Sequence, residues 1–147
     1  MRSIFNTRAD FVLTVMRLVL GVVFFAHGAQ KMLGWFGGNG FRATMGFFVH
    51  GMHIPAPFAF LVICAEFFGG IGLLVGFLTR IAAFGLLCDM FVALFLVHAQ
   101  NGFFMNWSGK KHGEGFEYHL LALALLFAML IRGAGTFSVD RLLSRRS

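Results

Sequence analysis

The chain contains few charged residues, only two cysteines and only two prolines. Its 147 residues include twelve Lys and Arg and six Asp and Glu, so 12% of the chain is charged, whereas soluble domains reach about a quarter. Because 59% of the residues are hydrophobic, one small globule cannot bury them all. The composition excludes an ordinary soluble domain and predicts an integral membrane protein whose main partner is the lipid bilayer.

The scarcity of cysteine limits the redox and metal chemistry of the chain. Cys64 and Cys88 both fall in apolar stretches, where we interpret them as small buried hydrophobic residues; a redox pair is the alternative. Neither a CxxC spacing nor a zinc signature is present. A phosphate-binding loop and an HExxH motif are also absent. The sequence therefore shows no intrinsic redox centre and none of these common catalytic motifs.

The positive charges gather at the two ends of the chain. The terminal arginines are Arg2, Arg8, Arg141, Arg145 and Arg146. They flank the apolar stretches, as expected for residues that anchor the cytoplasmic ends of a membrane protein. Although the net charge is +6, this placement predicts no nucleic-acid partner.

Four apolar segments are long enough to cross a membrane, at about 11–33, 57–78, 80–99 and 116–132. Backbone groups in lipid must be satisfied within their own segment, so we expect helices. The predicted fold is an all-α integral membrane protein, a four-transmembrane-helix bundle that forms a single domain over residues 1–147. An even number of spans puts both termini on one side, and the arginines predict that this side is the cytoplasm.

Two further patterns concern how the helices pack. Residues 41–52 predict a short amphipathic helix that lies in the outer interface between the first two spans. Its apolar stripe consists of Phe41, Met45, Phe48 and Met52. In the second span, Gly72 and Gly76 form a small-xxx-small pair, which predicts the close approach of another helix.

Six ionisable side chains lie within the predicted spans. They are Arg17, His27, Glu66, Asp89, His98 and Glu117. A charge near the bilayer centre costs at least about 2.5–3.5 kcal/mol, so each needs a partner, a cavity or a function. The helical rise of about 1.5 Å per residue separates the ionisable groups by depth. The middle layer holds Arg17, Glu66 and Asp89, and the outer layer holds His27, Lys31, His98, Glu117 and His119.

Each layer allows a structural and a functional interpretation. The middle layer is explained by an ion-pair network in which Arg17 compensates one carboxylate. The outer layer draws on three helices and favours a ligand site or a proton relay. Asp89 and His98 are nine residues apart, about 180° around a straight helix, so they share a cavity only if the third span is distorted. No close pair on one helix face supports a metal, and none is predicted.

Four segments of the chain combine ionisable residues with glycine at fixed spacings. They are Arg17-x3-Gly21-x5-His27-Gly28-x2-Lys31, then Glu66-x2-Gly69-Gly70 with Phe77-Leu78-Thr79-Arg80, then Gly115-Phe116-Glu117-Tyr118, and finally residues 133–140. These segments are similar to motifs of the DoxX family of small bacterial membrane proteins. In the last segment, Ala134 and Val139 stand where the family usually has Pro and Leu. The similarity extends from about residue 12 to residue 143.

This resemblance implies a four-helix bundle in the bacterial cytoplasmic (inner) membrane. It also implies a role as an oxidoreductase or quinone-linked membrane component, with a quinone as the expected ligand. The positions that match the family motifs are Arg17, His27, Lys31, Glu66, Glu117 and Tyr118.

We therefore expect a component of a membrane oxidoreductase that holds a quinone or another small ligand in the outer half of the bundle. The residues expected to bond the ligand or exchange protons are His27, Glu66, His98 and Glu117, and the further ligand-binding residues are Arg17, Lys31, Asp89 and Tyr118. Electrons would come from another membrane subunit or a bound cofactor, which leaves open whether the chain is itself an enzyme. The expected protein partners are such subunits or further copies of this chain. The alternatives are a non-catalytic accessory subunit of a larger membrane complex and, ranked last, a small proton-coupled transporter.

Overall fold

The computed structural model describes residues 2–146, and every regular element in this range is helical. The α-helices are α1 (Arg2–Phe5), α2 (Phe11–Leu33), α3 (Gly40–Gly46), α4 (Ala56–Val75), α5 (Thr79–Ala93), α6 (Glu117–Arg132) and α7 (Val139–Arg146). The other helical segments are the π-helical η1 (Phe47–Gly51) and η2 (Leu94–His98) and the 3-10 turn η3 (Ala99–Asn101). The predicted all-α fold is confirmed for the described residues.

Three of the four predicted spans are helices with the length and composition needed to cross a membrane. They are α2, α4 and the continuous helical stretch from Thr79 to Asn101. Helix α6 has 16 residues, about 24 Å at 1.5 Å per residue, and its crossing stays a prediction. The helix expected at 41–52 is formed by α3 together with η1.

Helices α2 and α4 approach each other closely because both carry glycine at the contact. A Cβ atom added at Gly28 would lie 2.4 Å from the backbone nitrogen of Phe67, and one added at Gly70 would lie 2.4 Å from that of Phe25. No side chain fits at such distances. The two backbones are therefore in direct contact, as small residues allow in membrane helices.

The expected helix contact through Gly72 and Gly76 is present only at Gly72, where an added Cβ would lie 3.5 Å from the Cβ of Ala82 on α5. Gly76 instead ends α4 in the left-handed region, with a φ of 70°, and its N–H donates to the carbonyl of Gly72. A Cβ atom at Gly76 would lie 2.5 Å from the Cβ of Ser138. Glycine is required here because the segment before α7 passes directly over the end of α4.

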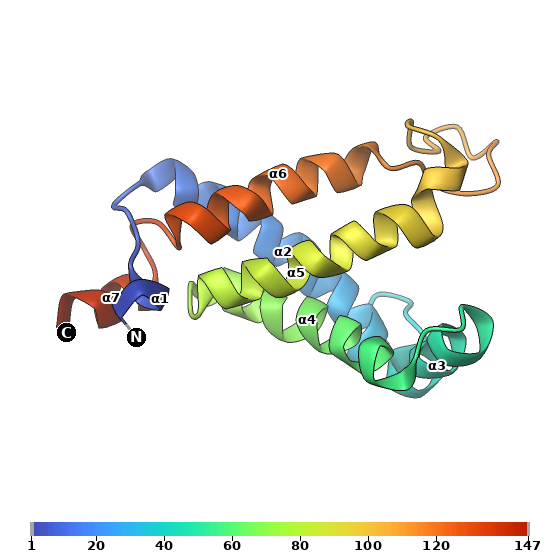
Figure 1. Cartoon of the computed structure of the whole chain (residues 1–147), viewed down its shortest axis with the longest axis horizontal. Coiled ribbons are helices and arrows are strands. Elements are labelled where there is room, and N and C mark those ends of the chain that lie inside the picture. The colour runs from blue at the N-terminus through green and yellow to red at the C-terminus, as the bar shows by residue number, and fades with distance from the viewer. Residues whose placement is uncertain (1, 147) are drawn as a thin grey trace.

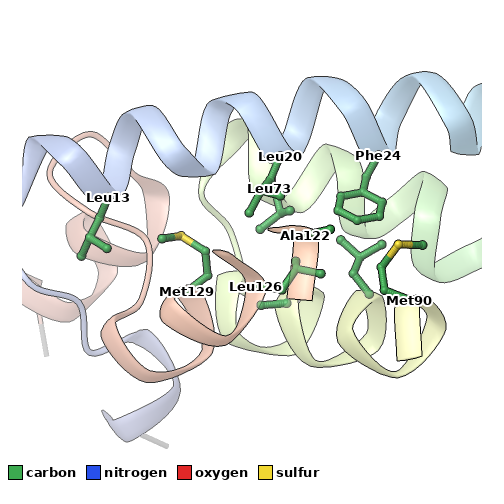
Figure 2. Close-up of a cluster of buried hydrophobic side chains, with 10 residues drawn as sticks. Leu13, Leu20, Phe24, Leu73, Met90, Ala122, Leu126 and Met129 are labelled. Atoms are coloured by element: carbon green, nitrogen blue, oxygen red, sulfur yellow. The ribbon is translucent and has the colours of Figure 1, made fainter. Parts of the chain in front are cut away.

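A cluster of buried apolar side chains joins the four longest helices (Figure 2). Its members are Leu13, Leu20 and Phe24 of α2, Leu73 of α4, Ala83, Leu86 and Met90 of α5, and Ala122, Leu126 and Met129 of α6. Phe24 and Met90 lie at one end of this cluster and Leu13 at the other (Figure 2). Helix α6 is thus an integral part of the bundle core.

The two ends of the bundle are built differently. Helices α1 and α7 lie side by side at the end that carries both termini (Figure 1). Toward the other end, α5 and α6 diverge from α4 and α3 (Figure 1). The apolar core fills the bundle on the side of the termini, whereas the helices separate at the other end and leave room between them for a cavity.

Candidate functional site

A cavity of about 410 Å³ opens between the diverging helices. Its wall is mostly apolar and includes Phe24 and Met90, so the cavity begins where the core cluster ends. The ionisable residues that line it are His27, Lys31, Glu66, Asp89, His98, Glu114, Tyr118 and His119. Of the eight site residues expected from the sequence, the fold brings six to this cavity and leaves Arg17 and Glu117 outside its lining.

An ion pair between Lys31 and Glu66 forms one polar part of the cavity wall. The Nζ of Lys31 donates to Oε2 of Glu66, which is buried, while Lys31 is partly buried. The two residues had been assigned to different depth layers, and the pair joins them. Cα–Cβ bonds tilt toward the N-terminus of a helix, and a lysine side chain is long. Lys31 therefore reaches back along α2 to the level of Glu66.

Asp89 on α5 faces this ion pair. Its side chain is buried, and Oδ2 has no hydrogen-bond partner among the described residues. Its charge interacts with those of Glu66 and Lys31. One ammonium group thus stands opposite two carboxyl groups, and a buried polar atom without a partner is costly. The arrangement is suited to accept a proton or a hydrogen bond from a ligand.

Two stacked histidines form the second polar part of the wall. The rings of His98 and His119 have centroids 4.0 Å apart and planes tilted by 38°. The Nδ1 of His98 lies 2.9 Å from the backbone oxygen of Glu114. His119 is buried, and its Nδ1 has no partner in the described part of the chain. Tyr118 stands edge-on to His119. The cluster thus contains a buried ring nitrogen that has no partner within residues 2–146 and belongs to a residue that lines the cavity.

The π-helical segment η2 explains why Asp89 and His98 line the same cavity. Over nine residues a regular α-helix would turn them about 180° apart. A π-helical turn holds one additional residue, so the effective rotation is that of eight residues and the angle falls to about 80°. Of the two alternatives for this pair, the distorted span is confirmed.

A second π-helical segment lies on the opposite wall. Phe47 and Phe48 of η1 line the cavity, as do Leu96, Val97 and His98 of η2. π-helical residues make up well under 1% of globular proteins, and single π-turns are frequent at functional sites. The presence of two π-helical segments at one cavity indicates that this cavity is a candidate functional site.

The exposed position of His27 differs from that of the other cavity residues. It is exposed at the edge of the cavity, whereas Glu66, Asp89 and His119 are buried. The sequence grouped His27 with His98 by depth. The fold instead pairs His98 with His119, which follows Tyr118 at the start of α6.

Arg17 lies far from the cavity, buried near the end of the bundle that carries the termini. Its guanidinium binds carbonyl groups: Nε donates to Ala134 at 2.9 Å, Nη2 to Phe137 at 2.6 Å, and Nη1 to Leu74 at 2.8 Å and to Leu73. The carbonyls of Leu73 and Leu74 are available because α4 ends at Gly76, and the last four carbonyls of a helix lack helical partners. The proposed pairing of Arg17 with Glu66 or Asp89 is therefore wrong.

Glu117 and Glu114 organise the loop before α6. Glu117 Oε1 accepts from the backbone N–H of Met105 at 2.9 Å and from Nε1 of Trp107 at 3.3 Å. Glu114 Oε2 accepts from the N–H of Asn106 at 2.6 Å. Glu114 also lines the cavity, and its carbonyl contacts His98. No local pattern distinguishes Glu114 from other polar loop residues, so sequence reasoning missed it.

The remaining reactive groups add no further centre. In residues 2–146, no group of three or more His, Cys, Asp or Glu side chains could hold a metal ion. Cys64 is partly buried, but Cys88 is exposed, so the prediction that both are buried is wrong for Cys88. In a membrane-spanning helix, this face of α5 points outward from the bundle. A redox role for the two thiols stays untested.

Comparison with known proteins places these features in a family. Residues 12–99 match the DoxX family model. The inner membrane protein YqjF of Escherichia coli (strain K12) is 31% identical over 137 residues, which cover 93% of this chain and 95% of that protein. The uncharacterized membrane protein Rv3486 of Mycobacterium tuberculosis (strain ATCC 25618 / H37Rv) is 35% identical over 142 residues, 89% of this chain and 80% of that protein. No solved structure matches the chain. The chain therefore belongs to the DoxX family, as the motifs in its sequence indicate.

Proposed function

We propose that this chain is a multi-pass inner-membrane protein that binds a quinone-like ligand and serves as the membrane component of an oxidoreductase system. The observation that carries the proposal is the cavity of about 410 Å³, in which an apolar wall meets two polar clusters. Sites for small ligands have this composition: mostly apolar walls with a few converging polar groups. Similarity to an inner membrane protein of Escherichia coli supports the location.

The proposed topology has four spans, with α6 as the fourth and both termini in the cytoplasm. Participation of α6 in the core supports a full crossing. Helices α1 and α7 lie at one end of the bundle (Figure 1), and α7 carries Arg141 and Arg145. Arg80 donates to the carbonyls of Asn6 and Leu130, which follow α1 and lie near the end of α6. The positive-inside rule expects such basic residues on the cytoplasmic side. The cavity then lies toward the outer half of the membrane.

The polar groups of the cavity match the chemistry of a quinone head. A carbonyl oxygen accepts a hydrogen bond, which the His98–His119 pair or Lys31 can donate. Reduction of a quinone to a quinol takes two electrons and two protons. Imidazole groups exchange protons near neutral pH and carboxyl groups act as general acids and bases, so Asp89 and the histidines supply the protons, while Glu66 is the anionic partner of Lys31. A partner subunit of the oxidoreductase system supplies the electrons.

The ligand enters the cavity from the membrane, between the two π-helical segments. Phe47 and Phe48 of η1 and Leu96 of η2 are apolar and line the cavity. An apolar entrance admits a molecule dissolved in lipid and disfavours an ion from water. This access route favours a quinone over a soluble substrate.

The test measures binding of a short-chain quinone to protein purified in a mild detergent. We expect saturable binding by the wild type and about five- to 100-fold weaker binding by Asp89→Asn and His119→Ala, since a lost hydrogen bond to a buried group costs about 1–3 kcal/mol. His112→Ala is the matched control, because His112 is exposed in the loop and does not line the cavity. Equal binding by all four proteins would contradict the proposed site.

The same preparation separates the accessory-subunit alternative. Mass spectrometry of a mild-detergent pull-down reports bound lipids, quinones and partner proteins together. A partner complex that stays bound to Asp89→Asn and His119→Ala, without any quinone in the wild type, would show an assembly role. Bound quinone that the cavity variants lose supports the ligand site.

A further inference from the structure

A second hollow, of about 500 Å³, lies at the opposite end of the molecule from the ligand cavity, where α4 meets α7. It is lined by Val75, Thr136, Phe137, Ser138, Val139, Arg141, Leu142 and Arg145. The set contains two guanidinium groups, several apolar side chains and no carboxylate. We propose that this terminal hollow binds an anionic phospholipid, with the phosphate at Arg141 and Arg145 and an acyl chain against Phe137 and Leu142.

The wall of the terminal hollow is held firmly in place. The chain around Phe137 is tied to α2, because Arg17 donates to its carbonyl and Thr136 N–H donates to Oγ1 of Thr14 at 2.9 Å. The N–H of Asp140 donates to the carbonyl of Gly76 at 2.9 Å. The backbone that carries the two arginines of α7 is therefore already fixed. A bound ligand would restrict little more than the side chains of these arginines.

The charge of the terminal hollow is positive because its neighbouring acid points inward. Asp140 is buried, and its carboxylate accepts from the N–H groups of Leu78 at 2.8 Å and Thr79 at 2.9 Å. Arg141 and Arg145 are one turn apart on α7 and share a face. The ion pair recorded within residues 2–146 is Lys31–Glu66, at another site. Among residues 2–146, no carboxylate forms an ion pair with either arginine of the hollow.

The apolar part of the terminal hollow distinguishes a lipid from a soluble anion. Phe137 is 68% exposed, Leu142 60% and Val75 50%. These side chains need apolar contact, which a free phosphate does not provide. A phospholipid carries a phosphate directly above acyl chains. Basic pockets at the ends of membrane helices are suited to such headgroups, and each arginine near an anionic surface adds to the attraction.

This proposal is independent of the quinone-like ligand. The terminal hollow shares no lining residue with the larger cavity, and the two lie toward opposite ends of the bundle. Failure of either proposal leaves the other unchanged.

The test is native mass spectrometry of the purified full-length chain titrated with phosphatidylglycerol or with phosphatidylcholine. We expect the wild type to bind phosphatidylglycerol at least about tenfold more tightly, consistent with two arginine contacts, and Arg141→Gln/Arg145→Gln to lose that preference. The control, Arg8→Gln/Arg132→Gln, removes the same charge from two exposed positions at this end of the bundle that do not line the hollow. It should bind as the wild type does.

Three results would overturn the proposal. If both double variants lost the preference for phosphatidylglycerol equally, the preference would come from the overall positive charge at the end of the bundle that carries the termini, and not from the hollow. Competition by inorganic phosphate in large excess would identify a soluble anion site. Unchanged binding by Arg141→Gln/Arg145→Gln would exclude the hollow. Should that variant unfold, Arg145→Gln alone serves instead, because Arg145 is exposed; it should weaken phosphatidylglycerol binding severalfold, and unchanged binding would again exclude the hollow.

Discussion

The buried ionisable residues of this protein differ in how far their polar atoms are satisfied. Arg17 donates hydrogen bonds to backbone carbonyls, and Lys31 forms an ion pair with Glu66. Asp89 has one oxygen without a partner among the described residues. The first two arrangements satisfy the buried groups with partners from the protein itself. The third leaves a group unsatisfied inside a cavity, which is the property expected of a residue that meets a ligand or a proton.

Replacement of Arg17 tests its structural role. Arg17→Leu removes the donors of four carbonyl groups, and each unpaired buried acceptor costs about 1–3 kcal/mol. We expect the free energy of unfolding to fall by at least about 3 kcal/mol, measured by SDS unfolding followed by circular dichroism. Arg17→Lys should recover only part of this loss. The compact ammonium group of lysine cannot donate to all four carbonyl groups, whereas the planar guanidinium group has several N–H donors that point in different directions.

The control for Arg17 is Arg132→Gln. Arg132 is exposed, so its replacement should change the free energy of unfolding by no more than about 0.5 kcal/mol. If Arg17→Leu were as stable as Arg132→Gln, the carbonyl cluster would not hold the terminal end of the bundle together.

At the scale of helices, the contact between α2 and α4 positions the polar site. Gly28 allows the backbone of α2 to lie against Phe67 and Glu66 on α4. Lys31 stands one turn beyond Gly28, which brings its side chain to Glu66. On the other side of the cavity, η2 rotates His98 toward Asp89. The close packing of α2 against α4 thus brings Lys31 to Glu66. The π-helical turn of η2 brings His98 to the cavity that Asp89 lines.

Addition of a single methyl group tests the α2–α4 contact. Gly28→Ala would place a Cβ 2.4 Å from the nitrogen of Phe67, so the helices must separate. Overpacking of this kind costs about 1–3 kcal/mol, and we expect a lower thermal midpoint in detergent together with weaker ligand binding. Gly85→Ala is the matched control in α5, since its Cβ would meet only the Cβ of Ala65 at an ordinary 3.6 Å. A Gly28→Ala protein as stable as Gly85→Ala would contradict the close contact.

At the scale of the whole molecule, one end of the bundle is packed and the other is open. The core cluster and the Arg17 contacts fill the end that carries α1 and α7 (Figures 1 and 2). The diverging end holds the ligand cavity. A rigid base and an open end suit a protein that admits a molecule from the membrane without unfolding.

The proposed topology predicts that the loop before α6 and helix α7 lie on opposite sides of the membrane. In a Cys64→Ala/Cys88→Ala background, a membrane-impermeant maleimide should label Ser108→Cys but not Ser144→Cys in intact spheroplasts. Both positions should be labelled after lysis, which is the control for accessibility. Labelling of both in intact spheroplasts would show that α6 does not cross the membrane, and labelling of Ser144→Cys alone would show that the molecule has the inverted orientation.

Much of the fold could be predicted because helix formation in an apolar chain is local. The span predicted at 11–33 coincides with α2, and α4 and α5 begin within one residue of their predicted starts. Six of eight expected site residues line one cavity. The two exceptions, Arg17 and Glu117, bind backbone groups from distant or irregular segments, and residue identity and depth carry no information on where such groups lie.

The sequence by itself determined that this protein is helical, resides in a membrane and carries ionisable groups at membrane depth. Composition, the length of apolar runs and the helical rise are properties of each segment alone. These features could therefore be predicted without knowing any contact between segments. Only the tertiary structure decided which charged groups meet. Lys31 reaches back to Glu66 because side chains lean along the helix. Asp89 and His98 face one cavity because a π-turn changes the helical register between them. Side-chain reach and backbone register depend on neighbouring helices, and that is why they emerged only with the fold.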